Sequence, residues 1–256
     1  MGSVTSETML HANDVHVWKI ALTTTSARVF ELRNLLHEEE LARADRFKLI
    51  QLTERFITGR AALRLILASY VGTQPQNVRF TYGKYGKPYL VQDADTTPLY
   101  FNLTHSGDLA LLAVTQARQV GIDVETVRPV DSLNHLARMI CSPSEYDTLL
   151  RLPLSDQIIG FFNCWTRKEA YIKATGKGLS QPLDQVTVTL SPGAKPELLY
   201  ANDADEANRW RIENVTVDPP YLAAITVERL LADGEDHPTF AYFTWNSGNE
   251  QPSSNG

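Results

Sequence analysis

The pattern of apolar and polar residues predicts a chain in which helices and strands alternate. Helices are expected at 38–48 and 55–71, and in the second range Phe56, Leu63 and Leu67 recur at helical spacing. Gly72 follows directly, which is typical of a helix C-terminus. Strands are expected where β-branched and aromatic residues partly alternate with polar ones, at 15–22, 78–82, 99–104, 109–115 and 119–125.

The second half of the chain repeats this order, with helices first and strands afterwards. Ser142, Pro143 and Glu145 supply a serine cap, a proline at the first helical position and a glutamate at the third, which together predict a helix start. Further helices are expected at 131–139 and 156–175. Strands are expected at 185–190, 209–217, 222–227 and 239–245.

We therefore predict an α+β fold made of two similar halves. The segments 109–115 and 222–228 are loosely alike in sequence, in agreement with the repeated order of elements. The division is expected between an N-terminal half, 1–118, and a C-terminal half, 119–245. Residues 246–256 are rich in Asn, Ser, Gly, Gln and Pro and are expected to form a disordered tail.

Composition then narrows the classes of function. A net charge of −6 disfavours a general nucleic-acid role, so any phosphate site must come from a local basic cluster. Cys141 and Cys164 lie outside any spacing typical of a zinc site, and two unpatterned thiols fit a reducing cytosol. The longest apolar stretches, such as 109–114, are too short to span a bilayer. A cytoplasmic protein that binds neither nucleic acid nor membrane is expected.

The first candidate for chemistry is a pair of carboxylates within 121–125. Side chains alternate along a strand, so Asp123 and Glu125 point to the same face and repel each other. Such a pair is stable when it is solvated at the end of a strand. It is also stable when a cation bridges it, and Mg²⁺ prefers carboxylate and phosphate oxygens. The two interpretations remain open at this point.

The second candidate lies in the helix expected at 156–175. Glu169 and Lys173 are four residues apart, which makes them neighbours on a helix surface and allows an ordinary ion pair. Trp165 and Ile172 fall on the same side of the helix as Glu169. A carboxylate beside an apolar stripe is poorly solvated and needs a partner. This position weakens the interpretation as a fully solvated surface ion pair.

Other polar positions lie next to expected turns. His105, between Thr104 and Ser106, is either a hydrogen-bonded structural residue or a donor to a phosphate. The segment 86–88, Gly-Lys-Pro, is a turn in which glycine permits close approach of a ligand. Most arginines on charged helices are solvated, and the sequence singles out no member of the basic set Arg43, Arg46, Arg55 and Arg60.

The order and spacing of these motifs together resemble the Sfp-type (surfactin-synthetase-activating) 4′-phosphopantetheinyl transferases. The motifs are Phe-Asn-Leu-Thr-His-Ser at 101–106, Gly-Ile-Asp-Val-Glu at 121–125 and Trp-Thr-Arg-Lys-Glu-Ala-Tyr-Ile-Lys at 165–173. The segments 56–60, 86–88 and 174–179 fit as well. The resemblance implies a monomer of two similar halves related by a pseudo-two-fold axis, with coenzyme A bound in the cleft between them.

The resemblance also implies roles for individual residues. It makes Asp123, Glu125 and Glu169 ligands of Mg²⁺, with Mn²⁺ as an alternative. The residues expected to contact coenzyme A are Arg43, Arg60, Lys87, Pro88, Thr104, His105 and Lys173, with Arg43 and Arg60 at the 3′-phosphate. The enzyme would move the phosphopantetheine of coenzyme A to a serine of an apo carrier protein and release 3′,5′-ADP. Glu169 is the expected base for that serine, with Lys173 as the alternative.

Two other functions are compatible with the same residues. One is a non-catalytic binder of coenzyme A or of a carrier protein, and the other is a Mg²⁺-dependent hydrolase of nucleotide pyrophosphates. Intact acidic and lysine positions favour the transferase over the binder. The partner is expected to be an apo acyl or peptidyl carrier protein, acidic around its serine. Its docking patch is expected near 128–150, with contributions from Arg138 and Arg151.

Overall fold

Two β-sheets that share an apolar interface form the centre of the molecule. The computed structural model describes residues 9–201, 204–230, 237–248 and 253–254. The larger sheet has the strand order β12-β11-β1-β5-β4, and the smaller sheet has the order β6-β10-β9. The larger sheet consists of β1 (Asp14–Ala21), β4 (Leu99–Ser106), β5 (Leu109–Gln116), β11 (Thr239–Trp245) and β12 (Ser253–Ser254). The smaller sheet consists of β6 (Val120–Thr126), β9 (Trp210–Asn214) and β10 (Tyr221–Glu228).

The strands of the larger sheet direct apolar side chains to both faces, and each face packs against another layer of the protein. In β1, Val15 and Val17 join an apolar cluster with Ile122 and Ile225 of the smaller sheet. Trp18 and the residues in phase with it point the other way, into a cluster with the helices of the first half. Successive strand residues face opposite sides, so a strand that lies between two cores needs apolar residues on both of its faces.

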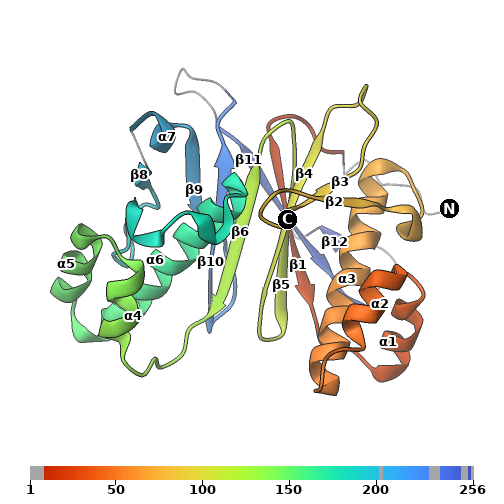
Figure 1. Cartoon of the computed structure of the whole chain (residues 1–256), viewed down its shortest axis with the longest axis horizontal. Coiled ribbons are helices and arrows are strands. Elements are labelled where there is room, and N and C mark those ends of the chain that lie inside the picture. The colour runs from red at the N-terminus through yellow and green to blue at the C-terminus, as the bar shows by residue number, and fades with distance from the viewer. Residues whose placement is uncertain (1–8, 202–203, 231–236, 249–252, 255–256) are drawn as a thin grey trace.

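Three helices cover the outer face of the larger sheet, on the right in Figure 1. They are α1 (Ser26–Arg33), α2 (Glu38–Ala44) and α3 (Ile50–Val71). A two-stranded hairpin of β2 (Phe80–Tyr82) and β3 (Pro88–Leu90) follows α3. The sequence pattern did not predict α1, which is short and is capped by Thr25, whose side chain accepts a hydrogen bond from the Arg28 amide.

Four helices accompany the smaller sheet, on the left in Figure 1. They are α4 (Leu133–Ile140), α5 (Pro143–Arg151), α6 (Leu154–Thr175) and α7 (Ala204–Asn208). The predicted start of α5 is confirmed, because the Ser142 hydroxyl accepts from the Glu145 amide while Glu145 accepts from the Ser142 amide. A second hairpin joins β7 (Val186–Val188) to β8 (Leu198–Ala201). β8 and α7 lie in 191–208, where the sequence predicted no element.

The predicted α+β fold of two similar halves is confirmed. Each half contains one long helix, α3 or α6, of 22 residues, which ends at a glycine in the left-handed conformation, Gly72 or Gly176. After each long helix comes an antiparallel pair, β4 with β5 in the first half and β9 with β10 in the second. The sheets face each other and the long helices lie outside them, so the halves follow one plan.

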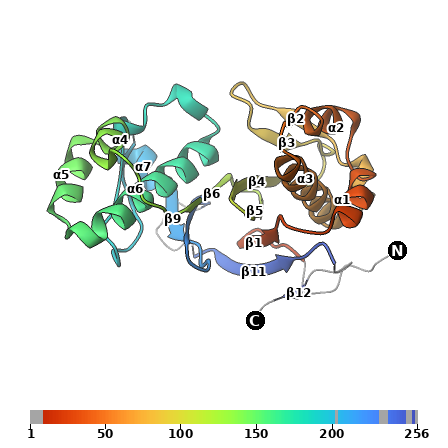
Figure 2. The same cartoon turned by 90° about the horizontal axis from the view of Figure 1, so that it is seen from below.

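The end of the chain differs from the expected division into 1–118 and 119–245. β11 follows the second half in sequence but pairs in parallel with β1 of the first half, from Asp14↔Thr239 to Ile20↔Trp245. Seen from below, β11 runs alongside β1 (Figure 2). Part of the tail expected to be disordered also has defined contacts: Ser253–Ser254 pair with β11, and the Ser247 hydroxyl donates to Thr24. The edge of β11 that faces away from β1 offers backbone groups with which these later residues pair.

Candidate active site between β6 and α6

The candidate site lies where β6 crosses very close to α6. At Gly121 a Cβ atom would lie 2.1 Å from the carbonyl oxygen of Ala170 and 2.2 Å from the amide nitrogen of Ala174. Any side chain here would collide with the helix backbone, so only glycine allows this approach. Asp123 and Glu125 lie two and four residues after Gly121, on the same face of the strand, and are therefore directed towards α6. The sequence 121–125 thus allows β6 to approach α6 closely and directs two carboxylates towards the helix.

Asp123 and Lys173 form the centre of the site. Asp123 is 4% exposed. Its Oδ1 accepts from the Lys173 ammonium at 2.5 Å and from the Thr104 hydroxyl at 3.2 Å. The Lys173 ammonium also lies 3.2 Å from Thr104 Oγ1. Residues from β4, β6 and α6 therefore meet at one point, as the sequence motifs predicted for these three side chains.

The carboxylates at this point disfavour one another's charge. Burial raises the pKa of Asp123 to about 6; Lys173 opposes this shift, while Glu169 and Glu125 add to it. Burial likewise raises the pKa of Glu169, again opposed by Lys173 and reinforced by Glu125. Glu125 accepts from the Ser106 hydroxyl at 3.2 Å. Lys173 is thus shared by Asp123 and Glu169, and Glu125 adds further negative charge beside them.

One oxygen of the site lacks a partner. Asp123 Oδ2 is buried and accepts no hydrogen bond from the described part of the chain, although Oδ1 of the same carboxylate accepts two. A buried carboxylate oxygen without a donor is costly unless something else satisfies it. A divalent cation that takes oxygen ligands would remove both the orphaned acceptor and the excess charge. Asp123, Glu125 and Glu169 therefore fit a site for Mg²⁺ or Mn²⁺.

His105 lies at the rim of this site, next to the end of β4. Burial lowers the pKa of His105, Lys173 lowers it further, Glu125 opposes the shift, and Arg43 and Arg55 add to it. One carboxylate and three cations are therefore close enough to His105 to influence its pKa. Arg55 also pairs with Asp108 at 2.5 Å. Sequence reasoning did not choose Arg55, because nothing in the pattern separates it from the other helical arginines.

Two predicted ligands of coenzyme A are engaged elsewhere. Arg60 pairs with Glu40 and stacks on Phe80, with its Cζ 4.9 Å from the ring centre. The Lys87 ammonium donates to the carbonyl oxygens of Ala174 and Val120, at 2.8 and 3.0 Å. Pro88 opens β3 directly after Lys87. Arg43 is exposed and stacks on Phe56 at 5.2 Å, so its guanidinium is accessible to a ligand.

A second cluster of possible metal ligands is closed by hydrogen bonds. The ligand atoms of Cys141, Glu145 and Cys164 all lie within 4.8 Å of one another, a closer grouping than that of Asp123, Glu125 and Glu169. Glu145 already accepts from the Lys168 ammonium at 2.5 Å and from the amides of Ser142 and Val188 at 2.6 and 2.7 Å. Because both carboxylate oxygens are satisfied, this cluster joins helices rather than binding an ion.

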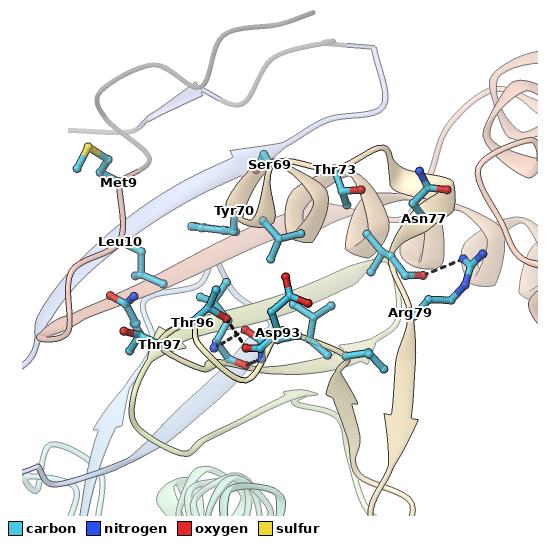
Figure 3. A pocket seen from close by; sticks show the side chains of 18 residues that line it. Met9, Leu10, Ser69, Tyr70, Thr73, Asn77, Arg79, Asp93, Thr96 and Thr97 are labelled. Atoms are coloured by element: carbon cyan, nitrogen blue, oxygen red, sulfur yellow. Dashed lines mark hydrogen bonds between the residues drawn. The ribbon is translucent and has the colours of Figure 1, made fainter.

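A cavity of about 750 Å³ lies away from these carboxylates, in the first half (Figure 3). It is lined by the C-terminal end of α3, the loop after β3 and the segment before β1, with Tyr70, Arg79 and Asp93 among its side chains. The polar groups of Tyr70 and Arg79 are already bonded within the protein: the Tyr70 hydroxyl to His16 and Trp18, and Arg79 to the Gln76 carbonyl. None of the predicted site residues lines it.

In the part of the chain that the structure describes, no helix is both long and apolar enough to cross a membrane.

Comparison with known proteins assigns the chain to a family. Residues 119–226 match the sequence model of the 4′-phosphopantetheinyl transferase superfamily, and residues 23–117 match that of the N-terminal part of 4′-phosphopantetheinyl transferases. The 4′-phosphopantetheinyl transferase HetI of Nostoc sp. is 38% identical over 218 residues, which cover 85% of this chain and 89% of that protein.

Two relatives from Bacillus species support the same family assignment. The 4′-phosphopantetheinyl transferase psf-1 of Bacillus pumilus is 31% identical over 79% of this chain and 83% of its own length. The 4′-phosphopantetheinyl transferase Sfp of Bacillus subtilis is 28% identical over 75% of this chain and 82% of its own. With its acidic cluster at the meeting of two matched halves, the chain belongs to the Sfp-type 4′-phosphopantetheinyl transferases, which move the phosphopantetheine group of coenzyme A to a serine of apo carrier proteins.

Proposed function

We propose that Asp123, Glu125 and Glu169 bind a divalent cation, Mg²⁺ or Mn²⁺, on which the transfer depends. The observation that carries the proposal is the buried Oδ2 of Asp123, which lies beside two further carboxylates and receives no hydrogen bond from the residues described in the structure. Two ligands from β6 and one from α6 leave room for phosphate and water oxygens, as Mg²⁺ sites require. When bound, the cation neutralises charge on the pyrophosphate of coenzyme A.

The basic groups around the carboxylates are suited to hold the phosphates. We assign contacts with phosphate oxygens to Lys173 and His105, supported by the Thr104 hydroxyl 3.2 Å from the Lys173 ammonium. Arg43 is assigned to the 3′-phosphate, because its guanidinium is exposed and influences His105. Arg60 is a weaker candidate for that phosphate, since its guanidinium already pairs with Glu40.

The reaction requires one proton to leave the carrier serine. The serine oxygen attacks the phosphorus that is esterified to pantetheine, the bond from that phosphorus to the bridging pyrophosphate oxygen breaks, and 3′,5′-ADP leaves. Glu169 is our choice of base, directly or through a water, because it is a half-buried carboxylate of the same site. Lys173 is the alternative, although its ammonium already donates to Asp123 and Thr104.

The carrier partner is proposed to dock on the second half beside this site. α4 presents Met139, which is 63% exposed, and next to it Arg138, whose Nε donates to the Tyr146 hydroxyl at 3.1 Å. An exposed apolar residue flanked by an arginine suits an acidic surface with an apolar helix face. Charge reversal of Arg138 together with Arg151 should raise the KM for the carrier, and an unchanged KM would refute this placement. We further expect a cytoplasmic monomer.

The decisive experiment incubates the protein with coenzyme A, Mg²⁺ and a panel of apo carrier proteins. Mass spectrometry should show a gain of ~340 Da on the carrier, the phosphopantetheine unit, only when the divalent cation is present. The Asp123→Asn variant should show no gain on the same time scale. Equal turnover in excess chelator would refute the metal proposal. Release of 3′,5′-ADP without a carrier would instead indicate a hydrolase.

A further inference from the structure

Lys87 lies in the turn between β2 and β3 of the first half, but its ammonium binds the second half. The residue is 7% exposed. The ammonium donates to the carbonyl oxygens of Ala174 and Val120 at 2.8 and 3.0 Å, and to Oε1 of Gln119 at 3.3 Å. An ammonium has three protons, so these acceptors use its full capacity. No donor remains for a phosphate oxygen without breaking one of these bonds.

The turn that carries Lys87 packs tightly against the end of α6. A Cβ atom at Gly176 would lie 3.1 Å from the Tyr89 hydroxyl oxygen and 3.2 Å from Cδ of Lys87. A Cβ at Gly178 would lie 3.3 Å from Cβ of Tyr85. Both glycines have positive φ, +67° and +54°, so both the backbone conformation and the space disfavour other residues. The turn and the segment 176–178 therefore form a built contact between the halves.

The two carbonyls that Lys87 binds belong to the two elements that carry the carboxylates. Ala174 is in the last turn of α6, directly after Lys173, where the final carbonyls lack partners within the helix. A cation at this end is also favoured by the helix dipole. Val120 is the first residue of β6, three positions before Asp123. One ammonium thus fixes the end of the helix to the start of the strand.

We propose that Lys87 is a positioning residue, which holds α6 and β6 in the register that places Glu169 and Lys173 opposite Asp123 and Glu125. This inference rests on the proposed metal and phosphate site, and it replaces the contact between Lys87 and coenzyme A expected from the resemblance. Burial lowers the pKa of Lys87 to about 8, with Glu228 opposing that shift, in agreement with an enclosed ammonium. The charge is retained in spite of this burial, because the three acceptors compensate it.

The test compares Lys87→Met, which keeps the aliphatic stem but removes all three donors, with Lys84→Met. Lys84 lies on the same turn but is exposed and stacks on Tyr85. For Lys87→Met we expect kcat to fall about 10- to 100-fold, because small misplacements of reacting groups lower the rate by this much. The KM for coenzyme A should change less than about threefold, and the Mg²⁺ concentration for half-maximal rate should rise. Lys84→Met should behave as the wild type.

A second substrate separates positioning from phosphate binding. The ratio of kcat/KM for coenzyme A to that for 3′-dephospho-coenzyme A should be the same in Lys87→Met and the wild type. A KM raised tenfold with kcat intact, or a collapsed substrate ratio, would overturn the proposal in favour of a phosphate ligand. Lys87→Gln serves if Lys87→Met does not fold, and failure of both to fold would reduce Lys87 to a structural residue. Wild-type activity in the same assay keeps these outcomes separate from failure of the proposed function.

Discussion

At the scale of single residues, the site buries the Asp123 carboxylate, which costs stability but supplies a proposed metal ligand. Asp123 is almost fully buried and pairs with Lys173, yet one of its oxygens accepts no hydrogen bond from any residue that the structure describes. A carboxylate in this position raises the free energy of the folded protein when no cation is bound, because burial and two neighbouring carboxylates oppose its ionisation. Activity and stability should therefore respond oppositely to its neutralisation.

Asp123→Asn tests that expectation. Without added metal, the variant should unfold at a temperature no lower than the wild type, because the amide removes a charge that burial and two carboxylates disfavour, while its oxygen can still accept from Lys173. Its kcat should fall by about 10³-fold or more, because a first ligand of the proposed cation is lost. Calorimetry and the carrier assay measure the two quantities. A loss of thermal stability as large as that for a core substitution would show that the Lys173 pair dominates instead.

His16 should make the fold sensitive to acid. It is 3% exposed, lies 2.7 Å from the Tyr70 hydroxyl and packs on Phe243. Burial lowers the pKa of His16 from 6.5 to about 4, with Asp14 opposing the shift. Between pH 6.5 and pH 4 this histidine binds more protons in the unfolded chain than in the folded one. Its contribution to the free energy of unfolding is therefore fully present above pH 6.5 and is lost as the pH falls towards 4. The expected loss is about 2–3 kcal/mol.

Denaturant unfolding at pH 7 and at pH 4.5 measures this effect. The difference in unfolding free energy between the two pH values should be smaller in His16→Asn than in the wild type, whatever the stability of the variant at pH 7. Identical pH dependence in the two proteins would assign the acid sensitivity to other groups.

Sequence reasoning at this scale identified residue types better than partners. Asp123, Lys173 and Thr104 were expected together and are in contact, because their motifs hold them on regular elements. Arg60 and Lys87 were expected at coenzyme A but bind Glu40 and backbone carbonyls. Those acceptors come from distant parts of the chain, so no local pattern could reveal them.

At the scale of elements, the site depends on the closeness of β6 and α6. Gly121 makes that closeness possible, since a Cβ atom at this position would collide with three backbone atoms of α6. Backbone atoms of a packed helix cannot move aside as a flexible side chain does. The sequence predicted both elements from their apolar periodicity, but periodicity does not reveal how near two elements approach.

Gly121→Ala should therefore be strongly destabilising, by about 3 kcal/mol or more, with loss of activity. Gly59→Ala is the matched control, because it is also buried and within an element, but its added Cβ would meet only the Leu22 side chain at 3.3 Å. In the helix, alanine is also favoured over glycine by about 1 kcal/mol. The control should unfold within about 1 kcal/mol of the wild type. Similar behaviour of both variants in thermal unfolding would contradict the close approach.

At the scale of the whole molecule, the two halves are joined by more than the connection between β5 and β6. The sheets share an apolar cluster, β4 meets β6 through the Asn102 side chain, which accepts from the Ile122 amide at 2.9 Å, and β11 returns to the first half. The order of elements predicted two halves, but it assigned β11 by its place in the sequence. A parallel partner 225 residues away, as in Asp14↔Thr239, leaves no local signal.

The return of β11 predicts where the chain can be shortened. The matched family region ends at residue 226, yet β11 lies beyond it and buries Phe243 against Trp18, with ring centres 4.6 Å apart. A chain that ends at residue 238 would lose the parallel partner of β1 and expose this aromatic core, so it should not fold cooperatively. A chain that ends at Gly248 keeps Trp245 and the Ser247 contacts with Thr24 and Arg28, and it should retain activity and lose at most about 1 kcal/mol of stability. Circular dichroism and the carrier assay distinguish the two, and an active, folded chain ending at 238 would show that the first half needs no strand from the C-terminus.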